Sequence, residues 1–189
     1  MLSEKLYQML HDGYETNEMG YRGRSFVEEN FMIEKNCEML QNTLPKVKFK
    51  ILGDGPYRRC FQHLNNIEYI GWVDRSDTPI LLSDVNILLF FRKDLGIGEI
   101  EALSMGKIII APNIGTIPSV IKHGENGFLV APDVESFVNM IEKTINLDMY
   151  TLERISKNAR KTASHAFSWK IVGEKWRSVI EYILESKNK

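Results

Sequence analysis

The sequence has little of what marks several large protein classes. Its 189 residues include two cysteines, Cys37 and Cys60, and neither stands at metal-ligand spacing. That pattern favours a reduced, cytoplasmic protein over a disulfide-stapled one. The longest apolar runs, such as VNILLFF, are far shorter than the roughly 20 residues that a membrane-spanning helix needs. We therefore expect no transmembrane segment.

Strong charge is also absent, since the formal net charge is −1. This balance gives no electrostatic reason to expect nucleic acid as a partner. The opening MLSEKLYQMLHDG contains acidic residues and lacks the apolar core of a signal peptide. Neither a D-x-D motif flanked by apolar strand residues nor a His/Cys cluster is present, so we expect neither a metal nor another cofactor.

What the sequence does contain is an alternation of apolar strands and helices. The predicted strands are VKFKIL, IEYIGWV, VNILLFF, KIIIA and GFLV, and the segments between them have helical periodicity. Nearly continuous hydrophobic strands separated by helices predict an α/β fold with a doubly wound, Rossmann-like parallel sheet. Ligands of such sheets bind beyond the carboxyl ends of the strands, near helix N-termini.

Capping signals set the expected helix limits. Ser76 and Asp77 are N-cap candidates before TPILLSD, Gly124 is expected to end TIPSVIKHG, and acidic residues open DVESFVNMIEKTINL. Other expected helices are PYRRCFQHL, SFVEENFMIEKNCEMLQN, and two helices over residues 151–185 that are broken near SHAFSW. The predicted domains are a polar, irregular segment over residues 1–25 with or without a helix, a Rossmann-like domain over 26–150, and a helical extension over 151–189.

Two glycine clusters are candidates for a ligand site. In ILGDGPYRR, Gly53 and Gly55 suit either close backbone approach to a ligand or a plain strand-to-helix turn. DLGIGEIEALSMG resembles a dinucleotide fingerprint. That motif belongs after the first strand of its unit, whereas this one follows the third recognisable strand, and the next strand ends with only Asn113 to meet a ribose. A nicotinamide dinucleotide site is therefore the less favoured alternative.

A second resemblance covers more of the chain. ILGDGP, IEYIGWVD, LLSDVNILLFF, GIGEIEALSMGKIIIAPNIGTIPSVIKHGENGFLVAPDVESF and FSWKIVGEKW follow one another in order. Together they resemble the C-terminal half of the family 4, GT-B-fold retaining glycosyltransferases, from about Lys46 to Glu185. The resemblance implies a single GT-B half-domain with C-terminal helices that binds the nucleoside-diphosphate sugar donor.

The resemblance also implies roles for particular residues. Glu101 matches the second glutamate of the family's E-x7-E motif, which grips the ribose hydroxyls through charge-assisted hydrogen bonds. The loop with Gly96 and Gly98 passes the donor diphosphate, and Glu99 is the other acid beside it. Further donor contacts are implied beside the cleft and, through the backbone, at the base: Gly53, Gly55, Gly71 and Val73.

The sequence differs from the family in two features: the first glutamate of the E-x7-E motif and the cations that hold the diphosphate. Eight residues before Glu101 stands Lys93 instead of the glutamate that contacts the donor sugar, and Asp94 replaces it only if the loop shifts register. Lys93 is interpreted either as a contact to a phosphate or an acidic sugar, or as a solvent-facing lysine, and no catalytic residue is assigned. The family's diphosphate clamp has no clear counterpart, although Arg22 or Arg24 is expected to supply one cation.

The functional prediction is hexosyl transfer from a nucleoside-diphosphate sugar with retention of configuration, this chain being the donor-binding half. Because the family's acceptor half is absent, the chain is expected to be a fragment, to need a second subunit, or not to be a working enzyme. The alternative is a degenerate, non-catalytic domain that acts as a partner subunit. The sequence specifies neither the base, the sugar nor the acceptor.

Overall fold

A computed structural model describes residues 39, 41–61 and 64–187. The chain divides into two compact units, Met1–Trp72 and Val73–Lys189, and each is described by itself. Most of the helix expected over residues 25–42 lies outside the described residues. The predicted domain boundaries after residues 25 and 150 stay predictions.

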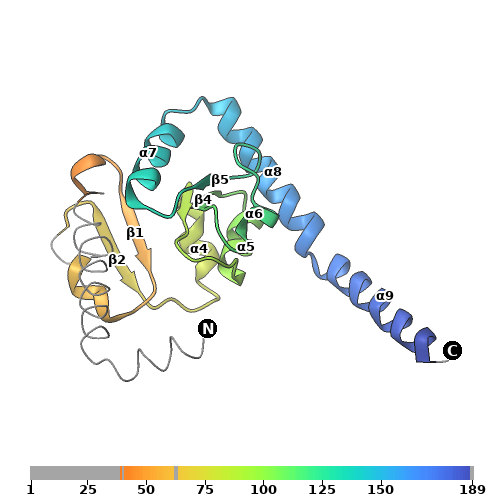
Figure 1. Cartoon of the computed structure of the whole chain (residues 1–189). Helices are drawn as coiled ribbons and strands as arrows, with labels where there is room; N and C mark the ends of the chain where they lie inside the picture. The colour runs from red at the N-terminus through yellow and green to blue at the C-terminus, as the bar shows by residue number, and fades with distance from the viewer. Residues whose placement is uncertain (1–38, 40, 62–63, 188–189) are drawn as a thin grey trace, which may run out of the picture. The chain divides into compact units, whose positions relative to one another are not determined.

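The first unit contains a two-stranded parallel sheet. Strand β1 (Phe49–Leu52) pairs with β2 (Ile67–Gly71), and the short 3₁₀ helix η1 (Pro56–Phe61) connects them (Figure 1). The prediction placed a longer helix here, reaching residue 64. The ring of Phe61 at the end of η1 stacks on Tyr69 of β2, with 6.1 Å between centroids. This contact attaches the connecting turn to the sheet.

The second unit contains a three-stranded parallel sheet with the order β3-β4-β5. Figure 1 labels β4 and β5. The strands of this sheet lie at the positions that the sequence predicts. The elements of this unit are α4 (Thr78–Ser83), β3 (Ile87–Leu89), α5 (Ile97–Ser104), β4 (Ile108–Pro112), α6 (Ile117–Val120), β5 (Phe128–Val130), α7 (Val134–Ile145), α8 (Met149–Phe167) and α9 (Trp169–Lys187).

The core of the second unit forms around β4, whose five residues are all buried. Successive side chains of a strand point to opposite faces of the sheet. Ile109 and Ala111 pack in one cluster with Leu103 of α5 and Ala159 of α8, whereas α7 contacts β4 and β5 without joining that cluster. A parallel sheet with helices packed on it confirms the predicted Rossmann-like α/β fold.

Small residues let α5 and α8 lie close together over the sheet. Ala102 and Ala159 are fully buried in their shared cluster. Just after α5, Gly106 has a φ of 72°, and its carbonyl oxygen accepts a hydrogen bond from the Ser156 hydroxyl at 2.7 Å. Because α5 carries Glu99 and Glu101, this packing fixes the helix on which the predicted donor residues stand.

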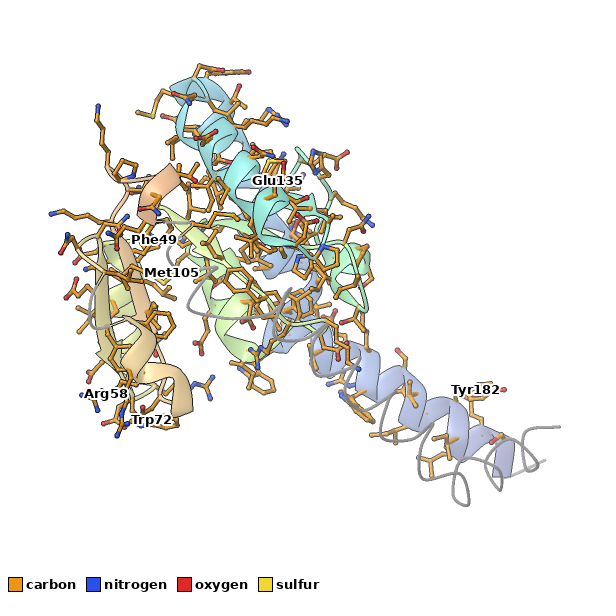
Figure 2. The ribbon with its side chains drawn as sticks, turned by 60° about the vertical axis from the view of Figure 1, so that its left-hand side comes forward. Phe49, Arg58, Trp72, Met105, Glu135 and Tyr182 are labelled. Carbon is orange, nitrogen blue, oxygen red and sulfur yellow. The ribbon has the colours of Figure 1, made fainter. Side chains whose placement is uncertain are left out.

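The C-terminal helices follow the predicted pattern. Helix α8 ends and α9 begins at Ser168, inside the predicted SHAFSW break. Helix α9 has a largely exposed apolar stripe that includes Trp176 and Ile180, and Figure 2 shows Tyr182 with its ring directed away from the other elements of this unit. Over the described residues, every helix is too short or too polar to cross a membrane.

One helix is shorter than expected. The sequence predicts that TIPSVIKHG continues to Gly124, but α6 ends at Val120 and Ile121 is already extended, with ψ at 127°. The amide of Asn126 explains the early end. Its oxygen accepts the Lys122 N–H at 2.6 Å, and its nitrogen donates to the Val120 carbonyl at 3.0 Å.

Candidate functional site

The loop between β3 and α5 carries most of the predicted donor residues. Gly96 stands at the N-cap of α5, and its N–H donates to the Glu99 carboxylate at 2.8 Å. Arg92 donates to both oxygens of the same carboxylate, at 3.1 and 3.4 Å. A β-carbon on Gly96 would lie 2.9 Å from the nearer Glu99 oxygen and 3.0 Å from Arg92 Nη2. A β-carbon at this position would therefore meet only the ends of two flexible side chains, and it would displace them from their present contact.

These contacts show what Glu99 does in the structure as described. Its side chain is only 10% exposed, and from the third helical position it accepts the N–H of the N-cap residue. This is the acidic half of a capping box, since Gly96 has no side chain to supply the other half. A carboxylate in the first turn also interacts favourably with the helix dipole. Glu99 thus stabilises the start of α5, and its predicted donor contact stays a prediction.

Lys93 and Asp94, where the resemblance predicted the family's first glutamate, are held by contacts with the loop after β4. The carbonyl oxygen of Lys93 accepts the Thr116 N–H at 3.1 Å, and the Asp94 carboxylate accepts the Thr116 hydroxyl at 3.1 Å. Gly115 has a φ of 59°, and a β-carbon there would overlap the Lys93 carbonyl. The loop after β4 therefore fixes the backbone of the loop after β3. The Lys93 side chain is exposed.

Glu101 lies two residues along α5 from Glu99, and its carboxylate is paired with Arg75. Both Nε and Nη2 of Arg75 donate to Oε1 of Glu101, at 3.1 and 3.0 Å. The Glu101 side chain is 29% exposed, so a solvent-borne ligand can reach it. An ionised carboxylate in this setting can accept hydroxyl groups. Of the two acids of α5, Glu101 is the more open to a ligand.

The glycine turn of the first unit is organised by a tyrosine. The Tyr69 hydroxyl lies 2.9 Å from both the Gly53 carbonyl oxygen and the Asp54 carboxylate, and Asp54 also accepts the Gly55 N–H at 2.8 Å. The Tyr69 contact, followed by the Gly55 N–H, lowers the pKa of Asp54 below its ordinary value. Burial, followed by the Asp54 contact, raises the pKa of Tyr69.

The predicted donor residues are divided between the two units. Gly53, Gly55 and Gly71 belong to the first unit, and Gly53 and Gly71 have φ values of 116° and 82°. A β-carbon added to Gly55 or Gly98 would have no other atom within 4 Å. Val73 is half-buried and is the first residue of the second unit. The other predicted donor residues of that unit lie on the loop before α5 and on α5 itself: Lys93, Asp94, Gly96, Gly98, Glu99 and Glu101. Arg22 and Arg24 lie outside the described residues.

Sequence reasoning missed three partners of this site. Arg75 is 26 positions from Glu101, and Thr116 is 22 positions from Asp94, so no local spacing pairs them. Arg92 directly precedes Lys93 and is seven residues from Glu99. Because Arg92 lies in the loop before α5, helical spacing does not predict this pair. For the two arginines, the only sequence signal was a charge opposite to that of a nearby acid, and many residue pairs in the sequence share that property. Thr116 has no charge and gave no signal.

The described residues were also searched for a metal site and for a pocket. No group of three or more His, Cys, Asp or Glu side chains that suits a metal ion occurs among them. A hollow lies between the segment at residues 119–126 and helix α8, and its lining includes Lys122, Asn126 and Lys161. None of the predicted donor residues lines that hollow.

Comparison with known proteins gives a consistent result. Sulfoquinovosyl transferase SQD2 of Arabidopsis thaliana is 30% identical over 158 residues, which are 77% of this chain and 31% of that protein. A crystal structure of HepE from Anabaena with UDP and glucose matches 78% of this chain and 44% of its own, at a TM-score of 0.67 and 21% identity. The crystallised C-terminal domain of LpcC, a group 1 glycosyl transferase of Francisella tularensis, matches over 72% of this chain and 77% of its own, with a TM-score of 0.58 and 18% identity.

The matched part of this chain spans 31% of the length of SQD2 and 44% of the HepE chain. The solved structures support the fold, and HepE and LpcC both cover more than two thirds of this chain. The family model described as glycosyl transferases group 1 matches residues 31–162, which is more than half of the sequence and includes the loop before α5 and all of that helix. The chain therefore belongs to the group 1 glycosyl transferase family.

Proposed function

We propose that this chain binds the nucleoside-diphosphate sugar donor of a retaining, family 4 glycosyltransferase in the cytoplasm. The observation that carries the proposal is the half-open Glu101 carboxylate on α5, beyond the carboxyl end of β3, inside the segment that the family model matches. A carboxylate at that place suits the two ribose hydroxyls of a nucleotide. HepE was crystallised with UDP, which makes UDP the first nucleotide to test.

The proposed chemistry is electrostatic. Departure of the nucleoside diphosphate leaves negative charge, which N–H groups at a helix N-terminus and nearby cations stabilise. The described cations near the start of α5 are Arg92, already paired with Glu99, and the exposed Lys93. We assign Lys93 to a phosphate or an acidic donor sugar, and Arg22 or Arg24 to the diphosphate. The proposal includes no metal and no other cofactor.

Transfer also needs an acceptor. We propose that a second domain or subunit supplies the acceptor site, and that this chain alone turns over little or no sugar. The alternative function is a degenerate partner subunit, which Lys93 in place of a glutamate and the exposed apolar stripe of α9 both favour. In that case the chain would bind a protein partner and no sugar nucleotide.

Thermal unfolding with UDP, GDP, ADP and their glucose conjugates distinguishes the two functions. A bound ligand at a hundredfold excess over its Kd stabilises by about 2.7 kcal/mol. For a chain of this size the Tm would then rise by roughly 5–10 °C. We expect one nucleotide series to produce this rise and Glu101→Gln to reduce it. An unchanged Tm with all of these compounds would favour the partner-subunit function.

A further inference from the structure

The carboxylate proposed to hold the ribose is already shared with an arginine. Arg75 lies in the segment between β2 and α4, and it reaches α5 within the same unit. Two of its N–H groups converge on one oxygen, Oε1 of Glu101, at 3.1 and 3.0 Å. Both distances are those of good hydrogen bonds, and the opposite charges strengthen them. The Arg75 side chain is 76% exposed, so the rest of the guanidinium faces solvent.

This arrangement divides the two oxygens of Glu101 unequally. A carboxylate has about four acceptor sites, two on each oxygen. The two Arg75 hydrogens use those of Oε1, and no described residue donates to Oε2. Oε2 therefore keeps two acceptor sites, which is the number that the two hydroxyls of a vicinal diol need.

We propose that Arg75 is a positioning residue that turns Oε2 of Glu101 toward the ribose and so makes this site selective for nucleotides with an intact 2′,3′-diol. This inference rests on the proposed donor-binding function. Its physical basis is preorganisation: a carboxylate already held in one orientation loses less side-chain freedom when a ligand binds. A lysine would supply the charge without the planar fork that fixes the direction of the carboxylate.

The ion pair contributes little to folding, because exposed pairs are weak. Changing Arg75 should therefore leave the unfolding midpoint nearly unchanged, and an effect on binding can be separated from an effect on stability. Lys157→Met is the matched control. It removes an exposed ion pair with Glu153 on α8, whose N–O distance of 3.1 Å is close to that of the Arg75 pair.

The experiment measures dissociation constants by calorimetry for UDP, GDP and ADP, each beside its 2′,3′-dideoxy form. For the preferred base, we expect wild-type protein to bind the ribose form at least about tenfold tighter, as for hydrogen bonds to a charged group. Arg75→Met should lower that preference about two- to fivefold, the range that an exposed ion pair can supply, by weakening only the ribose form, and Arg75→Lys should lower it less. Lys157→Met should bind both forms like wild type.

A double-mutant cycle tests whether Arg75 acts through Glu101. Glu101→Gln alone should abolish the ribose preference, and adding Arg75→Met should then change it by less than about twofold, because the two residues act as one unit.

Three results would overturn the inference while leaving donor binding intact. They are an equal loss of both nucleotide forms in Arg75→Met, an unchanged or higher ribose preference in that variant, and wild-type binding without any ribose preference. If wild-type protein binds none of the three nucleotides, the proposed function fails and this inference fails with it.

Discussion

At the scale of single residues, the most constrained contact of the candidate site is between two loops. Gly115 has a φ of 59° and lies against the Lys93 carbonyl, while the Thr116 N–H donates to that same carbonyl at 3.1 Å. The loop after β4 thereby sets the path of the loop after β3, in which Lys93 stands where the resemblance predicted a glutamate. Only glycine fits this approach, because any side chain would meet backbone.

Gly115→Ala should therefore destabilise the protein by about 2 kcal/mol or more, from a left-handed backbone and from overlap with the Lys93 carbonyl. Gly124→Ala is the matched control: its φ is 75°, but an added β-carbon meets nothing within 4 Å. That variant should lose only about 1 kcal/mol. Urea unfolding measures both, and equal losses would show that the contact with Lys93 does not matter.

The predictions for single residues of the site rest on different signals. Gly96 and Gly98 stand out locally as glycines that follow a strand, whereas Glu101 was singled out by the family resemblance. The pairing of Glu99 with Arg92, and that of Glu101 with Arg75, depends on how loops fold back on one another. Such contacts leave no periodicity in a sequence. Only the folded structure therefore shows that Glu99 caps the helix whereas Glu101 is accessible to solvent.

At the scale of elements, strands and long helices were predicted well because their signals are local. All five strands and helices α7, α8 and α9 occur where apolar periodicity and capping residues place them. Asp133 caps α7 by accepting the Ser136 N–H at 2.8 Å. Helix α6 was predicted too long, because the residue that ends it, Asn126, acts from beyond the helix and also bonds to Thr162 of α8.

The N-cap of α8 gives a pH-dependent prediction. The Thr151 hydroxyl, followed by the Thr151 N–H, lowers the pKa of Asp148 below its ordinary value. A lowered pKa in the folded state means that this acid stabilises the protein above its unfolded-state pKa, and that the contribution is lost as the pH falls through its folded-state pKa. Since α8 packs on α5, the loss bears on the helix that carries Glu101.

Asp148→Asn keeps a capping side chain but cannot titrate. We expect wild-type protein to lose more of its free energy of unfolding than the variant as the pH is lowered from 7 to about 3, below the ordinary pKa of aspartate. Urea unfolding at a series of pH values measures the difference. If that difference is the same at both ends of the series, Asp148 does not contribute in this way.

At the scale of the whole molecule, the order of motifs was more informative than any single motif. DLGIGEIEALSMG alone resembles a dinucleotide site. Its place after β3, together with the segments on either side, predicted a GT-B glycosyltransferase half-domain, and the chain belongs to the group 1 glycosyl transferase family. The base, the sugar and the acceptor were not predictable, because the resemblance implies that the base is met mostly by backbone and that the acceptor binds elsewhere.

The central claim is that a nucleoside diphosphate binds at the start of α5, and ¹H–¹⁵N NMR of the full chain tests it most directly. On titration with UDP, GDP or ADP, we expect one of them to shift the amide signals of Gly96, Gly98 and Glu101 in a saturable way. The amide of Gly173 in α9 should stay unchanged. Saturable shifts confined to other segments, or none with any of the three nucleotides, would contradict the claim.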